Sequence, residues 1–427
     1  MFKINNPDTY RIIKTKIARV LEIFKKDHYD IPYIVLYKRI EYEPELTSKD
    51  VWRIFELDKE WVKLFKMRKE TKKSFEKVAK YIEDPNIRHN YEFRFVHIAS
   101  SIRELKDTEI FIQFLRAFYH NDNEEFDDII LEDSNSPRPP KPPNRFTFID
   151  TFKKSKLIDL ARIGTITSYQ MAMNIEFTGE YKMDKMIFPD EPNEKIEEVS
   201  FRYIDSVYAE QIKVLTSTCK FLALELAAHP QIRNFVRSLY FNSATISTSP
   251  TTAGIVELDA FHPSYRTKRI YKRPIETFQN DLFLDVVENE KKRLIEVSFN
   301  LDDDKLNFIS EKLKMAYIRP KVQSNQSNQS NSSVEKENEI LKGWNQFREE
   351  VIQKLLFEVL LPELRADLRS FLLENAENYV LSECARNYSN LLMTGPYRRK
   401  VNNLYEDATP VVMSFVYDNV QRIVRYY

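Results

Sequence analysis

A short basic segment carries the most specific chemistry in this sequence. Residues 262–273 read HPSYRTKRIYKR and contain no acidic residue, and Tyr265 and Tyr271 interrupt the run of cations. Cationic side chains contact nucleic-acid phosphates and aromatic rings stack on bases, so this composition suits nucleic-acid binding. An ordinary surface loop accommodates the same residues, and both interpretations stay open. The candidate phosphate-binding residues are Arg266, Lys268, Arg269, Lys272 and Arg273.

A second basic cluster covers residues 63–80, where lysines and an arginine outnumber Glu70 and Glu76. At helical spacing these charges wrap around the helix and form no single stripe, which favours a solvated helix. The whole chain has 65 basic and 65 acidic residues. It therefore lacks the overall basic charge that is typical of nucleic-acid-binding domains, and any such binding must depend on local patches.

Residues able to catalyse a reaction or bind a metal are sparse and scattered. The six histidines form no HExxH or HxH motif, and Cys219 and Cys384 share no CxxC spacing. No GxSxG elbow and no glycine-rich phosphate loop occurs in a chain with only five glycines. The acidic run at 302–304 is typical of a solvated loop, because acid–base catalysis needs carboxylates in contrasting environments. We therefore predict no catalytic residue, no metal site and no cofactor, in a protein that is not an enzyme.

The composition predicts a mainly α-helical protein of more than one domain. The chain has 427 residues, 42% of them apolar, which is enough to bury a core. The scarcity of glycine disfavours tight hairpins, and no segment approaches about 18 uncharged apolar residues. The start of the chain has no apolar stretch of the kind found in signal peptides. We expect a soluble, intracellular protein in a reducing compartment.

Helical patterns dominate the N-terminal part. Residues 8–26 and 104–119 have apolar residues at helical spacing, with a short apolar run at 31–40 between them. Thr47 and Asp50 resemble a capping box that begins another helix. The apolar face predicted for that helix consists of Val51, Ile54, Phe55, Trp61 and Phe65.

Further segments are punctuated by proline and by polar tracts. Residues 134–144 contain five prolines and predict a stiff linker, or a ligand of an SH3 or WW domain. Residues 200–228 predict one helix with a buried stripe that ends at His229-Pro230. The polar tract at 323–333 predicts disorder. A long helical region follows from 338 to about 393, interrupted at Pro362, with an apolar face that includes Trp344, Phe347, Val351, Leu355, Val359, Leu364, Leu368, Phe371 and Leu372.

Several blocks of the sequence resemble one family in the correct order. The run at 31–39 resembles an IPFIARYRKE-type motif, and it is followed by an EPEL element at 43–46 and by a helix containing Trp52 and Trp61. The turn at 248–254 resembles a TPTxxG motif, and residues 271–275 and 283–288 resemble the block that follows it. An EGLL-type ending is replaced here by residues 292–295, which is a departure. Trp344, Asn345 and Arg348 match a WNxxR segment, and residues 395–398 resemble an APYRP turn.

These motifs resemble the family called suppressor of Ty six (Spt-six), eukaryotic elongation factors and histone chaperones related to bacterial Tex. The resemblance spans most of residues 10–425. It implies an elongated, multi-helix Tex-like core with a helix-turn-helix region, ending in the first strands of a truncated YqgF module of RNase H-like fold. We expect a partial chain of such a protein, without its acidic N-terminal tail and C-terminal nucleic-acid and SH2 modules.

The resemblance and the composition together predict six regions. They are a helical and helix-turn-helix region at 1–133, a Pro-rich linker with short helices at 134–199, a helical core with the basic loop at 200–320, a disordered Ser/Asn/Gln insert at 321–337, a long helical region at 338–400, and the start of the YqgF module at 408–427.

The YqgF strand is expected at Val411–Tyr417, starting after Pro410. In nuclease-competent relatives this strand carries a catalytic aspartate, but alignment by eye places Phe415 there and Asp418 beyond it. A lone acid does not hold two metal ions, so we expect no nuclease activity.

The resemblance implies a nuclear scaffold that acts with RNA polymerase II on chromatin and contacts histones and nucleic acid, without membrane association. Two alternatives remain. The first is a fragment of an RNase H-superfamily nuclease. The second is a generic helical adaptor without a role in transcription, although no self-similarity occurs at periods of 33–47 residues.

Overall fold

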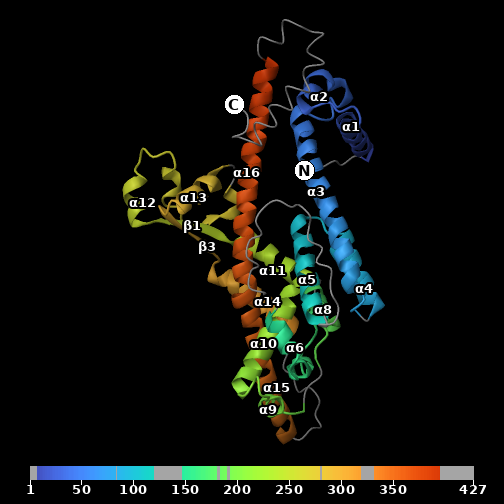
Figure 1. The fold of residues 1–427 in the computed structure, drawn as a ribbon, viewed down its shortest axis with the longest axis vertical. Helices are drawn as coiled ribbons and strands as arrows, with labels where there is room; N and C mark the ends of the chain where they lie inside the picture. The colour runs from blue at the N-terminus through green and yellow to red at the C-terminus, as the bar shows by residue number, and fades with distance from the viewer. Residues whose placement is uncertain are drawn as a thin grey trace.

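The structure is a computed structural model, and its described residues are mainly helical, as the composition predicts (Figure 1). Strands within the described residues form one small antiparallel sheet. The Pro-rich segment at 134–144 and the predicted YqgF strand lie outside the described residues, as does most of the Ser/Asn/Gln tract. The structure describes residues 7–82, 84–119, 147–179, 183–189, 193–278, 281–318 and 331–394.

The N-terminal helices confirm the predicted capping box. Thr47 caps α3, and its hydroxyl and backbone exchange hydrogen bonds with Asp50 as the motif requires. The run at 31–40 folds as helix α2 followed by a 3₁₀ turn, η1. The elements of this part are α1 (Pro7–Lys25), α2 (Ile31–Tyr37), η1 (Arg39–Glu41), α3 (Ser48–Ala79), α4 (Pro85–Tyr91), the π-helical turn η2 (Glu92–His97) and α5 (Ile102–Tyr119).

The apolar face predicted for α3 is only partly buried. Val51 is buried against α1 and α2, and Ile54 and Phe55 pack beside it. Trp61 and Phe65, on the next turns, are exposed. The predicted apolar face is therefore present but uncovered in the middle of the helix, because helical spacing identifies an apolar face and does not determine how much of it a neighbour covers.

Short helices then lead into the central helix α10. The predicted helix at 200–228 was too long, since α10 begins at Gln211 and residues 202–210 form a connection. Ile212 of the predicted buried stripe is 76% exposed, whereas Cys219, Leu222 and Leu226 are buried. The elements are α6 (Thr147–Lys153), α7 (Leu157–Arg162), α8 (Ser168–Gly179), η3 (Met183–Lys185), α9 (Ile196–Phe201), α10 (Gln211–Ala228) and α11 (Pro230–Ser243).

A small sheet lobe, residues 245–300, follows α11. Its strand order is β2-β1-β3, and β1 pairs antiparallel with both neighbours, with Thr245 opposite Asn300 and Pro250 opposite Ile295. The sequence interpretation contained no strand here. The elements are β1 (Thr245–Pro250), α12 (Thr252–Glu257), η4 (Tyr265–Thr267), β2 (Arg273–Pro274), η5 (Ile275–Thr277), α13 (Leu282–Lys291) and β3 (Ile295–Asn300).

Long helices complete the described chain. The predicted face of the 338–393 region is buried or half-buried along its whole length, which confirms that prediction. A π-helical segment, η6, ends just before Pro362. The regular α-helix is therefore interrupted close to the position that Pro362 predicted. The elements are α14 (Asp303–Tyr317), α15 (Asn331–Gln353), η6 (Lys354–Leu360) and α16 (Leu361–Thr394).

The described residues form an elongated body with α16 along its long axis (Figure 1). The largest hydrophobic cluster surrounds α10 and includes side chains of η6, α15 and α16. The N-terminal helices lie on one side of α16, and the sheet lobe projects on the other (Figure 1). None of the helices in the described ranges combines the length and the apolar character that a membrane span requires.

Candidate nucleic-acid interface

The basic loop, residues 262–273, is attached to β1 through Thr248. The Thr248 backbone N–H donates to the Ile270 carbonyl at 2.8 Å, and the Ile270 N–H donates to the Thr248 hydroxyl at 2.9 Å. The same hydroxyl donates to the Thr267 carbonyl at 2.7 Å. From the other side, the buried Asn289 amide of α13 donates to the Thr267 hydroxyl at 2.8 Å. The middle of the loop is therefore fixed between the sheet and α13.

The turn that resembles the TPTxxG motif joins β1 to the end of α13. The Thr251 hydroxyl accepts from the Gly254 N–H at 3.2 Å as the cap of α12, and donates to the Arg293 carbonyl at 2.7 Å. A Cβ atom on Gly254 would lie 1.8 Å from the Leu294 carbonyl oxygen, so only glycine fits this contact. The motif residues therefore have a structural role in closing the sheet lobe.

Two of the five predicted basic residues form ion pairs with acids that lie far away in the sequence. The Arg266 guanidinium contacts the carboxylates of Asp285 at 2.6 Å and Asp281 at 3.1 Å. Lys272 lies 3.2 Å from Asp302. The hydrogen bond to Asp285 raises the pKa of Arg266, and the hydrogen bond to Asp302 raises the pKa of Lys272. Tertiary structure thus brings carboxylates to a segment that has none of its own.

Two more of the five stabilise the loop itself. The Lys268 ammonium donates to the Leu258 carbonyl at 2.6 Å, at the C-terminal end of α12, where a cation is favoured. The Arg273 guanidinium donates to the Thr277 carbonyl at 2.8 Å and lies 5.0 Å from the Phe278 ring centre. Both cations already donate hydrogen bonds to backbone carbonyls, and this lowers their availability for a ligand.

Arg269 is the most available of the five. It is exposed, and within the described ranges it makes no hydrogen bond or ion pair. Tyr271, two residues on, is 84% exposed and can offer a ring for stacking. The ion pairs of Arg266 and Lys272 are solvent-exposed, and such pairs contribute little stability, so a phosphate could replace their carboxylates. This arrangement can bind an anionic, base-bearing ligand and offers no obvious reactive group.

The described part of the chain contains no assembled metal site and no reactive thiol. No group of three histidine, cysteine, aspartate or glutamate side chains converges there on a possible ion. The buried Cys219 and the half-buried Cys384 are both free. Burial raises the pKa of Cys219 to about 12, so its thiol stays protonated and unreactive.

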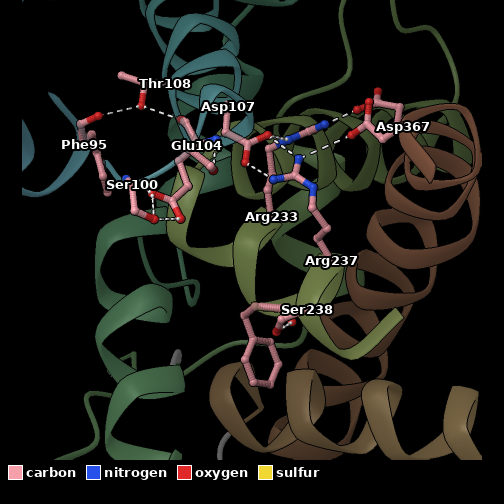
Figure 2. Close-up of polar contacts among 12 residues, drawn as sticks. Phe95, Ser100, Glu104, Asp107, Thr108, Arg233, Arg237, Ser238 and Asp367 are labelled. Atoms are coloured by element: carbon pink, nitrogen blue, oxygen red, sulfur yellow. Dashed lines mark hydrogen bonds and ion pairs between the residues drawn. The ribbon is translucent and has the colours of Figure 1, made fainter. Parts of the chain in front are cut away.

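A buried ionic cluster, which the sequence interpretation did not include, connects three helices (Figure 2). Asp107 of α5 accepts from Arg233 at 3.0 Å and from Arg237 at 2.5 and 2.6 Å, and both arginines come from α11. Arg233 also contacts Glu363 at 2.7 Å, and Arg237 contacts Asp367 at 3.3 Å, both on α16. Burial lowers the pKa of Arg237, but the hydrogen bond and charge of Asp107 more than offset this, and the pKa is raised.

The sequence contained a signal for this cluster. Asp107 precedes the buried Phe111 and Leu115 by four and eight residues, so it lies on the apolar face of its helix. Arg233 and Arg237 are four residues apart on α11. A charge on a buried face requires a partner of opposite sign, but the spacing does not show which helix supplies it.

The WNxxR residues are also structural. The buried Trp344 indole donates to the Glu194 carbonyl at 3.0 Å. The fully buried Arg348 donates through two nitrogens to the Gly164 carbonyl, at 2.9 and 2.6 Å, and through a third to Asn345 at 2.6 Å. Gly164 has a positive φ of 64°, a conformation that glycine adopts without strain. The segment therefore joins α15 to the connections before α8 and α9.

His229, at the junction of α10 and α11, is fully buried among aromatic rings. The ring centres of Tyr91, Phe95 and Phe111 lie 5.5–5.7 Å from the imidazole. Among the residues that the structure describes, neither imidazole nitrogen has a hydrogen-bond partner. Burial lowers the pKa of His229 to about 3, so the residue is neutral near pH 7 and packs as an aromatic side chain.

Comparison with known proteins identifies relatives over almost the whole chain. No protein-family model matches it. A transcription elongation factor SPT6 homolog of Arabidopsis thaliana is 23% identical over 95% of the chain and 24% of its own length. Transcription elongation factor SPT6 of Drosophila melanogaster is 23% identical over 90% of the chain and 23% of its own length. Transcription elongation factor spt6 of Schizosaccharomyces pombe is 22% identical over 95% of the chain and 28% of its own length.

These matches come from a plant, an insect and a fungus, and all are to transcription elongation factors. The chain is a distant homologue of the SPT6 transcription elongation factors, as the ordered motifs predicted. It spans about a quarter of the length of the relatives that it matches.

Proposed function

We propose that this chain is the helical scaffold of a nuclear transcription elongation factor that acts with RNA polymerase II on chromatin. The observation that carries the proposal is similarity to SPT6 factors over 90–95% of the chain. Residues of two of the motifs that resemble the family, Gly254 and Arg348 among them, have buried structural contacts, which fits a shared architecture. A Tex-like core that continues into a YqgF module, and contact with histones, belong to the same proposal.

The proposed mechanism is binding, not catalysis. The sheet lobe and the N-terminal helices lie on opposite sides of α16, so one elongated body offers separate surfaces (Figure 1). Within the described ranges the carboxylates of the buried cluster are paired with arginines, as at Asp107. Paired acids of this kind stabilise a fold, whereas an acid–base catalyst needs a group whose proton can move.

The central experiment is recovery of the tagged full chain from its source cells. We expect co-purification with RNA polymerase II subunits and enrichment on transcribed genes that falls when elongation is inhibited. A chain that purifies without polymerase and occupies no transcribed gene would support the generic adaptor. Metal-dependent cleavage of nucleic acid by the pure protein, lost on chelation, would support the nuclease alternative.

We also propose that the basic loop contacts nucleic acid, with Arg266, Lys268, Arg269, Lys272 and Arg273 as the phosphate-binding residues. Arg269 and Tyr271 support this best, because an exposed cation lies next to an exposed ring. Replacing all five cations would also remove the loop contacts of Lys268 and Arg273, and would confuse binding with folding.

The sharper test is the double variant R269A/Y271A, whose side chains are both exposed. Binding of a labelled single-stranded oligonucleotide should weaken, and the slope of log K against log salt should fall by about one, for one lost phosphate contact. The matched control is Y10A/K14A on α1, which also removes an exposed ring and an exposed cation. Equal binding by the wild type and R269A/Y271A would remove this loop from the proposal.

A further inference from the structure

The middle of α3 carries an exposed apolar stripe, which we call the α3 stripe. It begins where α1 ends, because Lys25, the last residue of α1, pairs with Asp58 at 2.6 Å. Up to that point α1 covers this face, with Phe24 and Phe55 in edge-to-face contact at 5.1 Å. The α3 stripe consists of Leu57, Trp61, Val62 and Phe65, which are 46%, 56%, 50% and 59% exposed.

The stripe continues an interface that is already present in the molecule. Val62 follows Phe55 by seven residues, and Phe65 follows Asp58 by seven, so each lies two turns further along the same face. Two turns extend that face by about 11 Å past the end of α1. One helix covers this apolar surface at one end and leaves it open at the other. A second helix can therefore pack on the open part in the same way.

The part of α3 that carries the stripe is fixed by contacts with neighbouring residues. Next to the stripe on α3, Leu64, seven residues after Leu57, packs with Leu105 and Ala99 in a small buried cluster. The Arg68 guanidinium donates to the Ala99 carbonyl at 2.7 Å and lies 5.7 Å from the Trp61 ring centre. Trp61 is therefore oriented by a cation that is itself fixed, and the ring remains more than half exposed.

Positive charge borders the stripe. Lys66 and Lys69 follow Val62 and Phe65 by four residues, and Lys73 follows Lys69 by four, so the three lysines lie along its edge. All three are exposed, and none has a carboxylate within ion-pair distance in the part of the chain that the structure describes. By the 3.6-residue period, the exposed Glu60 points roughly away from the stripe, whereas Glu70 follows Lys66 by four residues and is its neighbour. The three lysines therefore outnumber the acids along this edge.

We propose that the α3 stripe binds an acidic amphipathic helix of a partner protein. Apolar side chains of such a helix would cover Trp61, Val62 and Phe65, and its carboxylates would face Lys66, Lys69 and Lys73. A nucleic acid fits less well, because phosphates gain nothing from Val62 or Leu57. The surface lies on α3, so it is separate from the basic loop of the sheet lobe.

The probe is a fluorescein-labelled synthetic peptide of about five helical turns, with leucines on one face and glutamates on the other. The comparison peptides are a scrambled sequence of the same composition and a version with lysines in place of the glutamates. The full-length protein should bind the acidic amphipathic peptide preferentially in fluorescence anisotropy. Added salt should weaken the binding, and the tryptophan emission should shift to shorter wavelength as Trp61 is covered.

Two variants separate the apolar and the charged contributions. We expect W61A/F65A to weaken peptide binding about tenfold or more, since buried aromatic anchors dominate interfaces of this kind. K66E/K69E/K73E should lose the acidic peptide and gain the basic one. The matched control reverses three exposed lysines elsewhere, K14E/K291E/K305E, and should keep the wild-type preference. All of these side chains are exposed, and an unchanged urea midpoint will confirm that the variants fold.

Four results would overturn the proposal. The acidic peptide would bind no better than its scrambled form, or W61A/F65A would bind it as the wild type does. Alternatively, K66E/K69E/K73E would lose an RNA or DNA oligonucleotide that W61A/F65A retains, which would assign the surface to nucleic acid. A wild-type dimer in sedimentation that W61A/F65A converts to a monomer would assign the stripe to a second copy of the chain.

Discussion

The buried cluster and the sheet lobe both contain arginines that pair with two carboxylates, and the two regions differ in their access to water. In the buried cluster, Asp107 holds Arg233 and Arg237 between α5 and α11, and these three side chains are at most 8% exposed. In the sheet lobe, Arg266 reaches Asp281 and Asp285 with its side chain half exposed. Similar distances therefore describe interactions of different strength.

The difference shows why ion-pair geometry alone does not identify a binding site. A buried pair that loses one partner leaves an uncompensated charge away from water, and this is strongly destabilising. An exposed pair exchanges its partner for water or for a ligand at little cost. Ligand contact is therefore expected at Arg266 and its exposed neighbours, whereas Arg233 and Arg237 hold helices together.

The largest effect should come from Asp107→Ala. It would leave Arg233 and Arg237 without their shared carboxylate, and should lower the free energy of unfolding by about 3–5 kcal/mol. Urea denaturation followed by circular dichroism measures this. Asp285→Ala in the sheet lobe is the matched control, and an equal loss in both variants would remove the distinction between the regions.

Acid should destabilise the helical core through His229. Its pKa is about 3 in the folded chain and 6.5 is its ordinary value, so between these pH values only the unfolded chain binds this proton. The free energy of unfolding should therefore fall as the pH decreases across this window, by at most about 1.4 kcal/mol per pH unit from this residue.

The variant H229L tests this contribution. Relative to the wild type, its urea midpoint should change less between pH 7 and pH 5. An identical pH dependence in the two proteins would show that His229 is already protonated, or is solvated, in the folded state.

Gly254→Ala should disturb the sheet lobe specifically. The added Cβ would collide with the Leu294 carbonyl, and relief of such a clash typically costs about 1–3 kcal/mol. Hydrogen exchange should rise in the lobe while α10 stays protected. Gly179→Ala, whose Cβ would meet no atom within 4 Å, serves as the control and should change neither region.

The smallest effect is expected for Arg266→Ala. Its pairs with Asp281 and Asp285 are exposed, so the variant should lose no more than about 1 kcal/mol of stability. The same urea titration measures it next to Asp107→Ala. A loss of several kcal/mol would mean that the basic loop depends on this pair for its conformation, and its availability to a ligand would then be in doubt.

Local features of the fold were predictable because they depend on residues within one or two turns. The capping box of Thr47 and Asp50 formed as predicted, and the helix break fell at Pro230. The long C-terminal face was predictable because apolar residues recur at helical spacing over many turns, from Trp344 to Leu372. Such patterns determine which side of a helix is apolar, without reference to the rest of the chain.

The strands of the sheet lobe were not predicted. β1 contains Ser247, Ser249 and Pro250, a composition that suits a turn as well as a strand. Its strand conformation depends on pairing with β3, whose residues lie 45–55 positions away. A short strand has few contacts of its own, and the pairing that stabilises it forms only in the folded chain.

The sequence by itself indicated the helices through the spacing of apolar residues, the family resemblance through the order of motifs, and the candidate loop through its acid-free run of basic residues. Tertiary structure alone decided which charges and apolar groups remain accessible. Asp285 lies 19 positions from Arg266, and the cover of α1 ends at Asp58, which leaves Trp61 in solvent. Accessibility depends on which distant element packs on a surface, and helical spacing carries no information about that element.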